Sequence, residues 1–370
     1  MNVPGSNVAR HLRIAATEHP AGLATKSPTG VSAAGEVRHE VRTFRQLDQE
    51  SDAAAGYFAS AGITEGSRVL LAVRPGHDLI VGMFALLKLG AVPVAIDPGM
   101  GWSAFLDCVT RSRPTALVGV NAAVWLSYLP FKAFRTLSRR VTVGGSAWRQ
   151  ALASASPTPR PLAATGSETL AAILFTSGST GAPKGVCYTH GMFDAQIELV
   201  RTTYALRPGE TDMAMLPLFA LFNPALGATT VTPLLDPSKP LAADPAPIVS
   251  ALIAEKVTRS FGSPAIWSKV ADHCEARGLK LPDLRRLLIA GAATLAAPWV
   301  HAQSSGWPGS TPPPREDSLS MPTTRDGLSG RQTKAQNARF LILLALKCAS
   351  TGLGLFGKKR LRNCIGRTAV

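Results

Sequence analysis

Short apolar runs alternate along the chain with segments of helical period. The run 67–73, SRVLLAV, is aliphatic and bounded by turn-forming residues, which predicts a buried strand. Residues 78–90 repeat apolar positions with a helical period and end on glycine, which predicts a helix. The same reasoning predicts strands at 91–97 and 114–120 and a helix at 102–112. This order of strands and helices is typical of a parallel sheet covered by helices.

The alternation resumes after residue 168 and continues to about residue 292. Apolar runs of strand length again lie between turn formers, and longer amphipathic stretches separate them. The pattern predicts an α/β protein with mostly parallel sheets flanked by helices. The predicted strands here are 171–176, 185–190, 211–218, 229–235, 258–262 and 284–291, and the predicted helices are 191–205, 246–256 and 264–278.

Changes in composition divide the chain into four parts. Residues 154–168 are rich in proline, serine, threonine and alanine, and we interpret them as a linker between two α/β subdomains, 10–153 and 169–292. The tail 293–370 differs from both subdomains. Its segment 304–339 has no sustained period and is dense in Ser, Thr, Pro, Gly and charge, so the tail is predicted to be disordered.

Charge separates the tail further from the rest of the chain. Residues 1–292 hold 28 Lys/Arg and 21 Asp/Glu, a surplus of 7, whereas residues 293–370 hold 11 and 3, a surplus of 8. The basic cluster 358–367 has two interpretations: contact with nucleic acid or another anionic surface, or a sequence without a selected fold. Composition favours the second interpretation, so no specific nucleic-acid partner is predicted.

Cysteine usage and hydropathy indicate a cytoplasmic protein. None of the five cysteines forms a C-x-x-C pair or has a histidine at zinc spacing, which fits a reducing compartment. The N-terminus has no apolar core of signal-peptide length. The most apolar stretch, 340–357, is interrupted by Lys347 and several small polar residues, so no transmembrane segment is predicted.

The stretch 173–190, ILFTSGSTGAPKGVCYTH, carries the candidate chemistry. From Thr176 to Lys184 it offers four hydroxyls, two glycines, a proline and a lysine. Glycines allow backbone amides to point inward as an anion nest, and the lysine adds a mobile positive charge. It is not a Walker A loop, because Pro183 precedes Lys184 and no helix follows at once. From the residues alone, phosphate binding and an ordinary flexible turn both stay open.

The segment 175–186, FTSGSTGAPKGV, closely resembles the phosphate-loop signature of the adenylate-forming superfamily, which includes acyl-CoA synthetases, peptide-synthetase adenylation domains and luciferases. The resemblance covers residues 10–292. AIDPGMG and PLFALFNPALG look most like fatty-acid ligases, particularly the β-lactone synthetases of olefin biosynthesis. The implied fold is an incomplete large N-terminal domain of this family, followed by an irregular tail. The supporting segments, in family order, are 43–76, 83–101, 216–227, 261–267 and 284–292.

The resemblance implies a set of site residues. Lys184 is the expected catalytic residue, and no metal ligand is assigned. Many relatives carry histidine where this chain has Ala220, and the smaller apolar residue indicates a longer, more apolar substrate. Phe219, Phe222 and Trp267 are expected to line an acyl pocket, although ordinary core packing would suit them equally. The residues expected to hold the nucleotide are Thr176, Ser177, Gly178, Ser179, Thr180, Gly181 and Gly291.

The implied reaction is that of an AMP-forming acid ligase in fatty-acid and lipid metabolism. ATP binds against the glycine loop with Mg²⁺ bridging its phosphates, and the carboxylate of a fatty acid or β-hydroxy fatty acid attacks the α-phosphorus. The acyl-adenylate then meets CoA, or its own β-hydroxyl in the lactone-forming branch.

Several residues that the family needs do not occur in the chain. There is no Tyr-Gly-x-Thr-Glu, whose glutamate is the expected magnesium ligand, and no Thr-Gly-Asp, whose aspartate would hold the ribose. The small C-terminal domain with its lysine has no counterpart. One hypothesis is a shift of the coding frame near residue 292. The alternative function is therefore an inactive truncated homologue that at most binds a nucleotide or an acyl chain.

Overall fold

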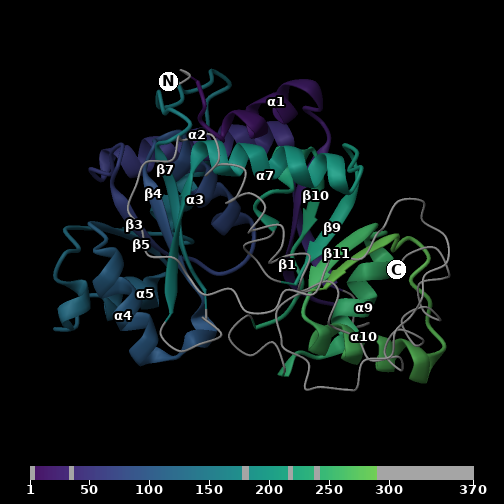
Figure 1. The fold of residues 1–370 in the computed structure, drawn as a ribbon. Helices are drawn as coiled ribbons and strands as arrows, with labels where there is room; N and C mark the ends of the chain where they lie inside the picture. Colours follow the sequence, from purple (N-terminus) through teal and green to yellow (C-terminus); the bar gives the residue numbers. More distant parts are fainter. Residues whose placement is uncertain (1–4, 33–36, 177–182, 216–219, 237–241, 290–370) are drawn as a thin grey trace, which may run out of the picture.

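The computed structural model describes residues 5–32, 37–176, 183–215, 220–236 and 242–289. These residues form an α/β fold, as the alternating pattern predicts (Figure 1). The strands are arranged in two six-stranded sheets. The tail 293–370 and its predicted disorder lie outside the described residues.

The first sheet has the strand order β6-β5-β3-β4-β7-β8. Its strands are parallel except for β8, which runs antiparallel to β7. A mainly parallel sheet needs cover on both faces, which explains its nearly continuous apolar strands. The bounds are β3 Arg68–Ala72, β4 Val92–Ile96, β5 Ala116–Gly119, β6 Arg139–Thr142, β7 Leu170–Thr176 and β8 Lys184–Thr189.

The second sheet has the strand order β12-β11-β9-β10-β1-β2 and is also parallel apart from its edge strand β2. Strand β9 ends at Ala214 and β10 at Val231, earlier than the predicted runs. Pro233, which lacks a backbone N–H, lies just beyond β10. The bounds are β1 Leu23–Val31, β2 Val37–Thr43, β9 Thr211–Ala214, β10 Thr229–Val231, β11 Arg259–Gly262 and β12 Arg286–Ile289.

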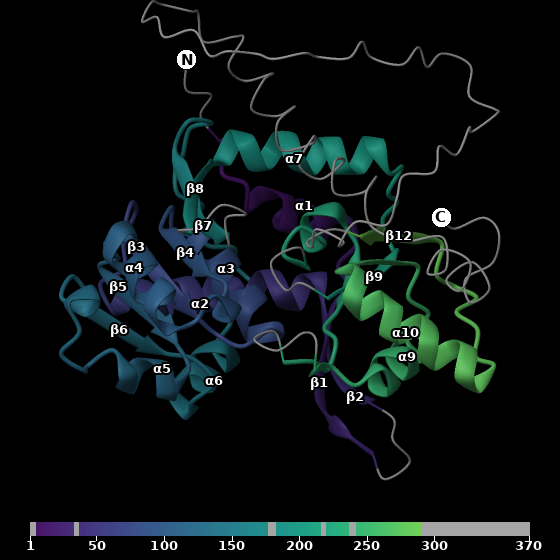
Figure 2. The ribbon, with the colours of Figure 1, turned by 60° about the horizontal axis from the view of Figure 1, so that its bottom comes forward.

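Helices cover both sheets in layers. Helices α2 and α3 lie between the sheets, α4 and α5 cover the outer face of the first sheet, and α9 and α10 cover the second (Figure 2). The helices are α1 Arg10–Glu18, α2 Phe44–Ser60, α3 His77–Lys88, α4 Trp102–Ser112, α5 Asn121–Leu126, α6 Ser146–Ala153, α7 His190–Thr203, α9 Pro245–Ala254 and α10 Pro264–Arg277, with 3-10 turns η1 Pro98–Met100, η2 Lys132–Phe134 and η3 Pro224–Leu226.

Local sequence signals fix several helix ends. Thr43 and Gln46 form a capping box at the start of α2, each side chain bonding the other residue's backbone N–H. Helix α10 has Ser263 as its N-cap and a proline at its first position, and it stops at Gly278, whose φ of 63° suits glycine.

The two sheets do not follow the division into residues 10–153 and 169–292. Strands β7 and β8 join the first sheet, while β1 and β2 join the second. Each sheet thus draws strands from both sides of 154–168. That segment is irregular, and it is anchored, since the backbone N–H of Ala163 donates to the carbonyl of Lys88 at 2.9 Å. The proposed subdomain boundary stays a prediction.

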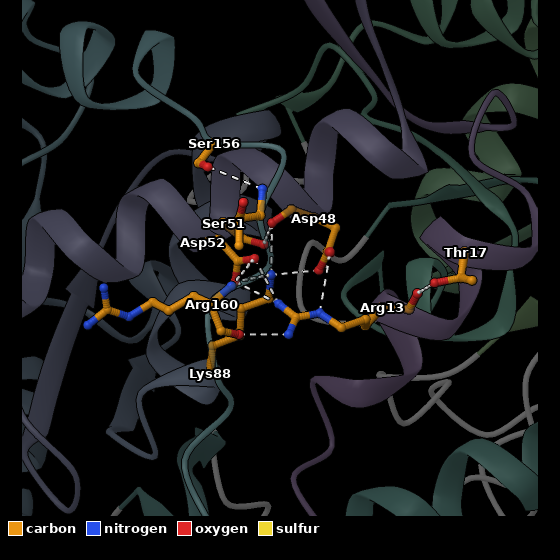
Figure 3. Close-up of polar contacts among 9 residues, drawn as sticks. Arg13, Thr17, Asp48, Ser51, Asp52, Lys88, Ser156 and Arg160 are labelled. Carbon is orange, nitrogen blue, oxygen red and sulfur yellow. Dashed lines mark hydrogen bonds and ion pairs between the residues drawn. The ribbon is translucent and has the colours of Figure 1, made fainter.

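A buried ion cluster joins three helices and this irregular segment (Figure 3). The Lys88 ammonium on α3 is almost fully buried and donates to Asp48 Oδ1 at 2.6 Å and to Asp52 Oδ1 at 2.8 Å, both on α2. Arg13 on α1 donates to both oxygens of Asp52 at 2.8 Å. The carbonyl of Arg160 accepts from Arg13 at 2.7 Å. Two cations and two carboxylates thus neutralise one another away from water.

We predict that Lys88→Ala destabilises the fold by about 3–5 kcal/mol, because it leaves two carboxylates partly buried with one cation fewer. Urea denaturation measures the change. Arg45→Ala, at an exposed position on α2, is the matched control and should leave the midpoint unchanged. Equal midpoints for the two variants would contradict the role of the cluster.

Candidate functional site

The predicted phosphate loop connects two strands at the carboxyl edge of the first sheet. Strands β3, β4, β5 and β7 are parallel, so their carboxyl ends meet at one edge. Ligands of open α/β sheets bind outside that edge. Strand β7 reaches it at Thr176, which lies opposite Lys184, the first residue of β8.

The described part of the loop agrees with an accessible site. Lys184 is exposed, and Arg111 on α4 donates to the carbonyl of Pro183 at 2.6 Å. Gly185 lies opposite Phe175, and a Cβ at Gly185 would come 2.9 Å from that ring. The glycine after Lys184 therefore lets the two strands close tightly. Of the remaining predicted nucleotide residues, Ser177, Gly178, Ser179, Thr180, Gly181 and Gly291 lie outside the described residues.

Phe222 lies at an apolar cavity of ≈ 50 Å³ between α3, β7 and α7. Its ring meets Phe193 edge-on at 5.6 Å, and Phe193 stacks on Tyr188 of β8. Strand β7 supplies Ala172 and Leu174 to the wall of the cavity, and β8, which carries Lys184, lies behind Phe193. The lining residues are Val8, Met83, Phe84, Leu87, Ala172, Leu174, Phe193, Ile197, Leu221, Phe222 and Ala225.

Trp267 lies elsewhere, in the core between α10 and the second sheet. It is fully buried and does not line the cavity at Phe222, so the structure does not bring these two predicted pocket residues together. Its indole N–H has no hydrogen-bond partner among the described residues, and a Cβ at Gly262 would come 2.8 Å from that nitrogen. Phe219 lies outside the described residues, and Ala220 is buried.

A buried polar cluster fixes the segment that carries Phe222. Asn223 donates to Asp212 Oδ2 on β9 at 2.6 Å, and Arg259 on β11 donates to Asn223. Burial raises the pKa of Asp212, and Arg259 and Asn223 act in the opposite direction. Sequence reasoning missed this cluster, because its charged members stand at the beginnings of short strands where no motif marks them.

His190, the first residue of α7, is fully buried just beyond β8. Its Nδ1 accepts from the backbone N–H of Val8 at 3.1 Å, and its Nε2 has no partner among the described residues. Burial lowers the pKa of His190 to about 4, because the charged form would lose hydration. A neutral imidazole thus ties the N-terminal segment to the hairpin.

Among the described residues, no three His, Cys, Asp or Glu side chains are grouped as a metal ion would need. In the same part of the chain, no helix is long and apolar enough to cross a bilayer.

Comparison with known proteins shows the class. The family model described as AMP-binding enzyme matches residues 16–306. The chain therefore belongs to the AMP-binding enzyme family, the adenylate-forming superfamily that the phosphate-loop signature indicated.

Within that family the chain is similar to olefin beta-lactone synthetases. It is 41% identical over 302 residues to the one from Stenotrophomonas maltophilia (strain K279a), covering 79% of this chain and 53% of that protein. It is 39% identical over 292 residues to the one from Xanthomonas campestris pv. campestris, covering 77% and 52%. The chain spans about half the length of these curated relatives.

Solved structures confirm the fold. The N-terminal domain of FACL13 from Mycobacterium tuberculosis matches with a TM-score of 0.63 at 21% identity, covering 80% of this chain and 71% of that one. A long-chain-fatty-acid-CoA ligase from Archaeoglobus fulgidus matches with a TM-score of 0.66 at 18% identity, covering 80% and 59%. The described residues thus have the fold of the N-terminal domain of adenylate-forming enzymes.

The depressed pKa of His190 predicts a pH dependence of stability. The folded value of about 4 lies below the unfolded value of 6.5, so the unfolded state binds the proton first as the pH falls. The stability that neutral His190 contributes is fully present above pH 6.5 and is lost as the pH falls from 6.5 to 4. The free energy of unfolding decreases over that range by on the order of 3 kcal/mol.

Urea denaturation at a series of pH values measures this effect. In His190→Gln, the free energy of unfolding should no longer decrease between pH 6.5 and 4 because of this residue. In His19→Gln, at an exposed position, the decrease should remain. Identical pH profiles for the wild type and His190→Gln would refute the assignment.

Proposed function

We propose that the chain is the nucleotide-binding part of an AMP-forming acid ligase that activates a fatty acid, with a β-hydroxy fatty acid as the preferred substrate. The observation that carries the proposal is the β7–β8 hairpin, which sets Lys184 at the carboxyl edge of a parallel sheet within a family signature. The 41% identity to an olefin beta-lactone synthetase supports the substrate class.

In the proposed first step, a carboxylate oxygen forms a bond to the α-phosphorus of ATP while the bond to pyrophosphate breaks. Lys184 neutralises charge on the leaving phosphates, and backbone amides of the glycine loop share that role. Lys184 is exposed at the start of β8, opposite Thr176 at the carboxyl end of β7. In the second step the β-hydroxyl oxygen forms a bond to the acyl carbon while the bond from that carbon to the phosphate oxygen of AMP breaks, and the hydroxyl proton passes to the departing AMP phosphate.

CoA is the alternative acceptor for that second step. The names of the two similar synthetases favour the internal hydroxyl, whereas the fatty acyl-CoA ligases share only the fold at this level of identity.

The family's Mg²⁺ does not fit the residues at hand. The described part of the chain offers no group of three metal-ligating side chains, and the sequence lacks Tyr-Gly-x-Thr-Glu with its glutamate. ATP itself fits better, because the exposed Lys184 supplies positive charge at the carboxyl edge of the first sheet.

The apolar cavity at Phe222 supports an apolar acid. Its lining is entirely hydrophobic, and its ≈ 50 Å³ has room for a few small groups. A long acyl chain therefore requires the side chains around Phe222 to move. Ala220 fits the same substrate class, because it replaces an imidazole with a methyl group.

A second candidate function is a nucleotide- or acyl-binding homologue without turnover. The observation that favours it is the absence of both Tyr-Gly-x-Thr-Glu and Thr-Gly-Asp from all 370 residues. Without the ribose aspartate, ATP would be held by its phosphates alone.

Exchange of labelled pyrophosphate into ATP with a long-chain β-hydroxy acid tests the proposal. We expect exchange in the wild type and a loss of about 10²-fold or more in Lys184→Ala, because one charge-stabilising group is removed. Lys280→Ala, at an exposed position far along the chain, is the control.

Three outcomes separate the candidates. Exchange that Lys184→Ala leaves intact would remove Lys184 from the site. No exchange, together with ATP binding by calorimetry that Lys184→Ala abolishes, would identify the binding homologue. Neither exchange nor binding would overturn both candidates.

A further inference from the structure

Large apolar side chains gather on the outer surface of the first sheet's helical cover. Trp125 is 77% exposed, Tyr128 65%, Leu129 47%, Trp102 42% and Leu126 37%. They come from the start of α4, from α5 and from the turn after α5, and the Trp102 ring meets Phe131, two residues after Leu129, at 5.6 Å. We name these five residues the aromatic patch. Clustered exposed apolar groups mark interaction sites, whereas single ones do not.

Neighbouring side chains pack against two rings of the aromatic patch. Trp102 stacks on Phe105 at 5.5 Å and meets Phe131 edge-on at 5.6 Å. The guanidinium of Arg140 lies over the Tyr128 ring at 4.4 Å, and its Nε donates to Ser127 Oγ at 2.8 Å. Because Trp102 and Tyr128 are already packed against neighbours, these two rings lose little conformational entropy when the patch binds a partner.

Positive charge surrounds the aromatic patch. Residues 102–140, which carry the patch, contain six Lys/Arg and one acidic residue, Asp107. Lys132 on η2 and Arg135 just after it are exposed a few residues after Leu129. A second copy of the chain seated on this face would bring like charges together, which disfavours self-association through it.

We propose that the aromatic patch docks on the surface of a bilayer that contains anionic lipids. Trp and Tyr rings prefer the headgroup level, leucines enter the acyl boundary, and Lys/Arg pair with anionic headgroups. Charge alone would also suit a nucleic acid or an acidic protein. The exposed tryptophan and leucines among the basic residues favour the bilayer, since apolar side chains gain most by leaving water there.

Helices α4 and α5 connect the aromatic patch to the candidate nucleotide site. Helix α5 begins two residues after β5 ends at Gly119, at the same sheet edge that β7 reaches at Thr176. Arg111, on the helix that begins at Trp102, donates to Pro183 beside the phosphate loop. Docking does not depend on the proposed function. If both hold, docking would bring that sheet edge close to a source of apolar acids.

Co-sedimentation of the full chain with lipid vesicles tests the proposal. Vesicles of phosphatidylcholine and phosphatidylglycerol in equal parts are compared with vesicles of phosphatidylcholine alone. We expect partitioning onto the mixed vesicles that is about tenfold weaker or less on the neutral ones, because the basic residues lose their anionic partners.

Two sets of variants locate the contact. The triple variant Trp125→Ser, Tyr128→Ser, Leu129→Ser should weaken partitioning at least about tenfold, since three apolar groups are removed. Its control, Val31→Ser, Val41→Ser, Ile253→Ser, changes exposed apolar residues elsewhere and should bind as the wild type does. Lys132→Glu with Arg135→Glu should weaken binding more than Arg38→Glu with Arg45→Glu, exposed positions on β2 and α2.

Every variant keeps the basic tail, so differences between variants report on the aromatic patch. Thermal melts by circular dichroism check folding, and the high exposure of the substituted side chains predicts unchanged melting. Equal partitioning of the wild type and the triple variant would overturn the proposal. Equal binding to neutral and mixed vesicles would also overturn it. A third contrary outcome is a dimer of the wild-type chain in sedimentation velocity that the triple variant alone fails to form.

Discussion

The charge of Lys88 constrains much of the rest of the structure. An ammonium buried between two sheets is tolerated only with carboxylates beside it, and Asp48 and Asp52 on the neighbouring helix supply them. Arg13 and the backbone of residue 160 complete the cluster, so it also fixes α1 and the irregular segment 154–168. The cluster thus ties α1, α2, α3 and residue 160 to one another in the layer that contacts β1 and β4.

Much of the fold could be predicted from the sequence. The expected helices and strands between residues 67 and 120, and most of those after residue 168, are present, because buried parallel strands and amphipathic helices have distinct periods. The hydrophobic pattern did not predict β1, β2 and β6. Exposed and buried residues are mixed along these strands, so they lack a clear apolar run. The exchange of strands between sheets could not be predicted either, because it depends on contacts distant in sequence.

The glycine loop of the candidate site could be recognised in the sequence, whereas the set of residues around the acyl pocket could not, for a physical reason. A glycine- and hydroxyl-rich loop is encoded in one continuous segment, so the sequence alone identifies it. Its two described ends, Thr176 and Lys184, lie opposite each other at the carboxyl edge of the first sheet. The acyl pocket is made by side chains from several elements. Phe222 meets Phe193 and Met83 there, whereas Trp267 packs in a different core. Cavities assembled from distant elements leave no periodic signal in any one segment.

The close approach of Trp267 to Gly262 has an evolutionary consequence. No room exists for even one methyl group between strand β11 and the indole, so the two positions are sterically coupled. A lineage that gains alanine at 262 must shrink the aromatic residue at 267 at the same time or lose the packing of α10. Paired replacement at these two positions, rather than independent drift, is the pattern that selection would leave among descendants of this chain.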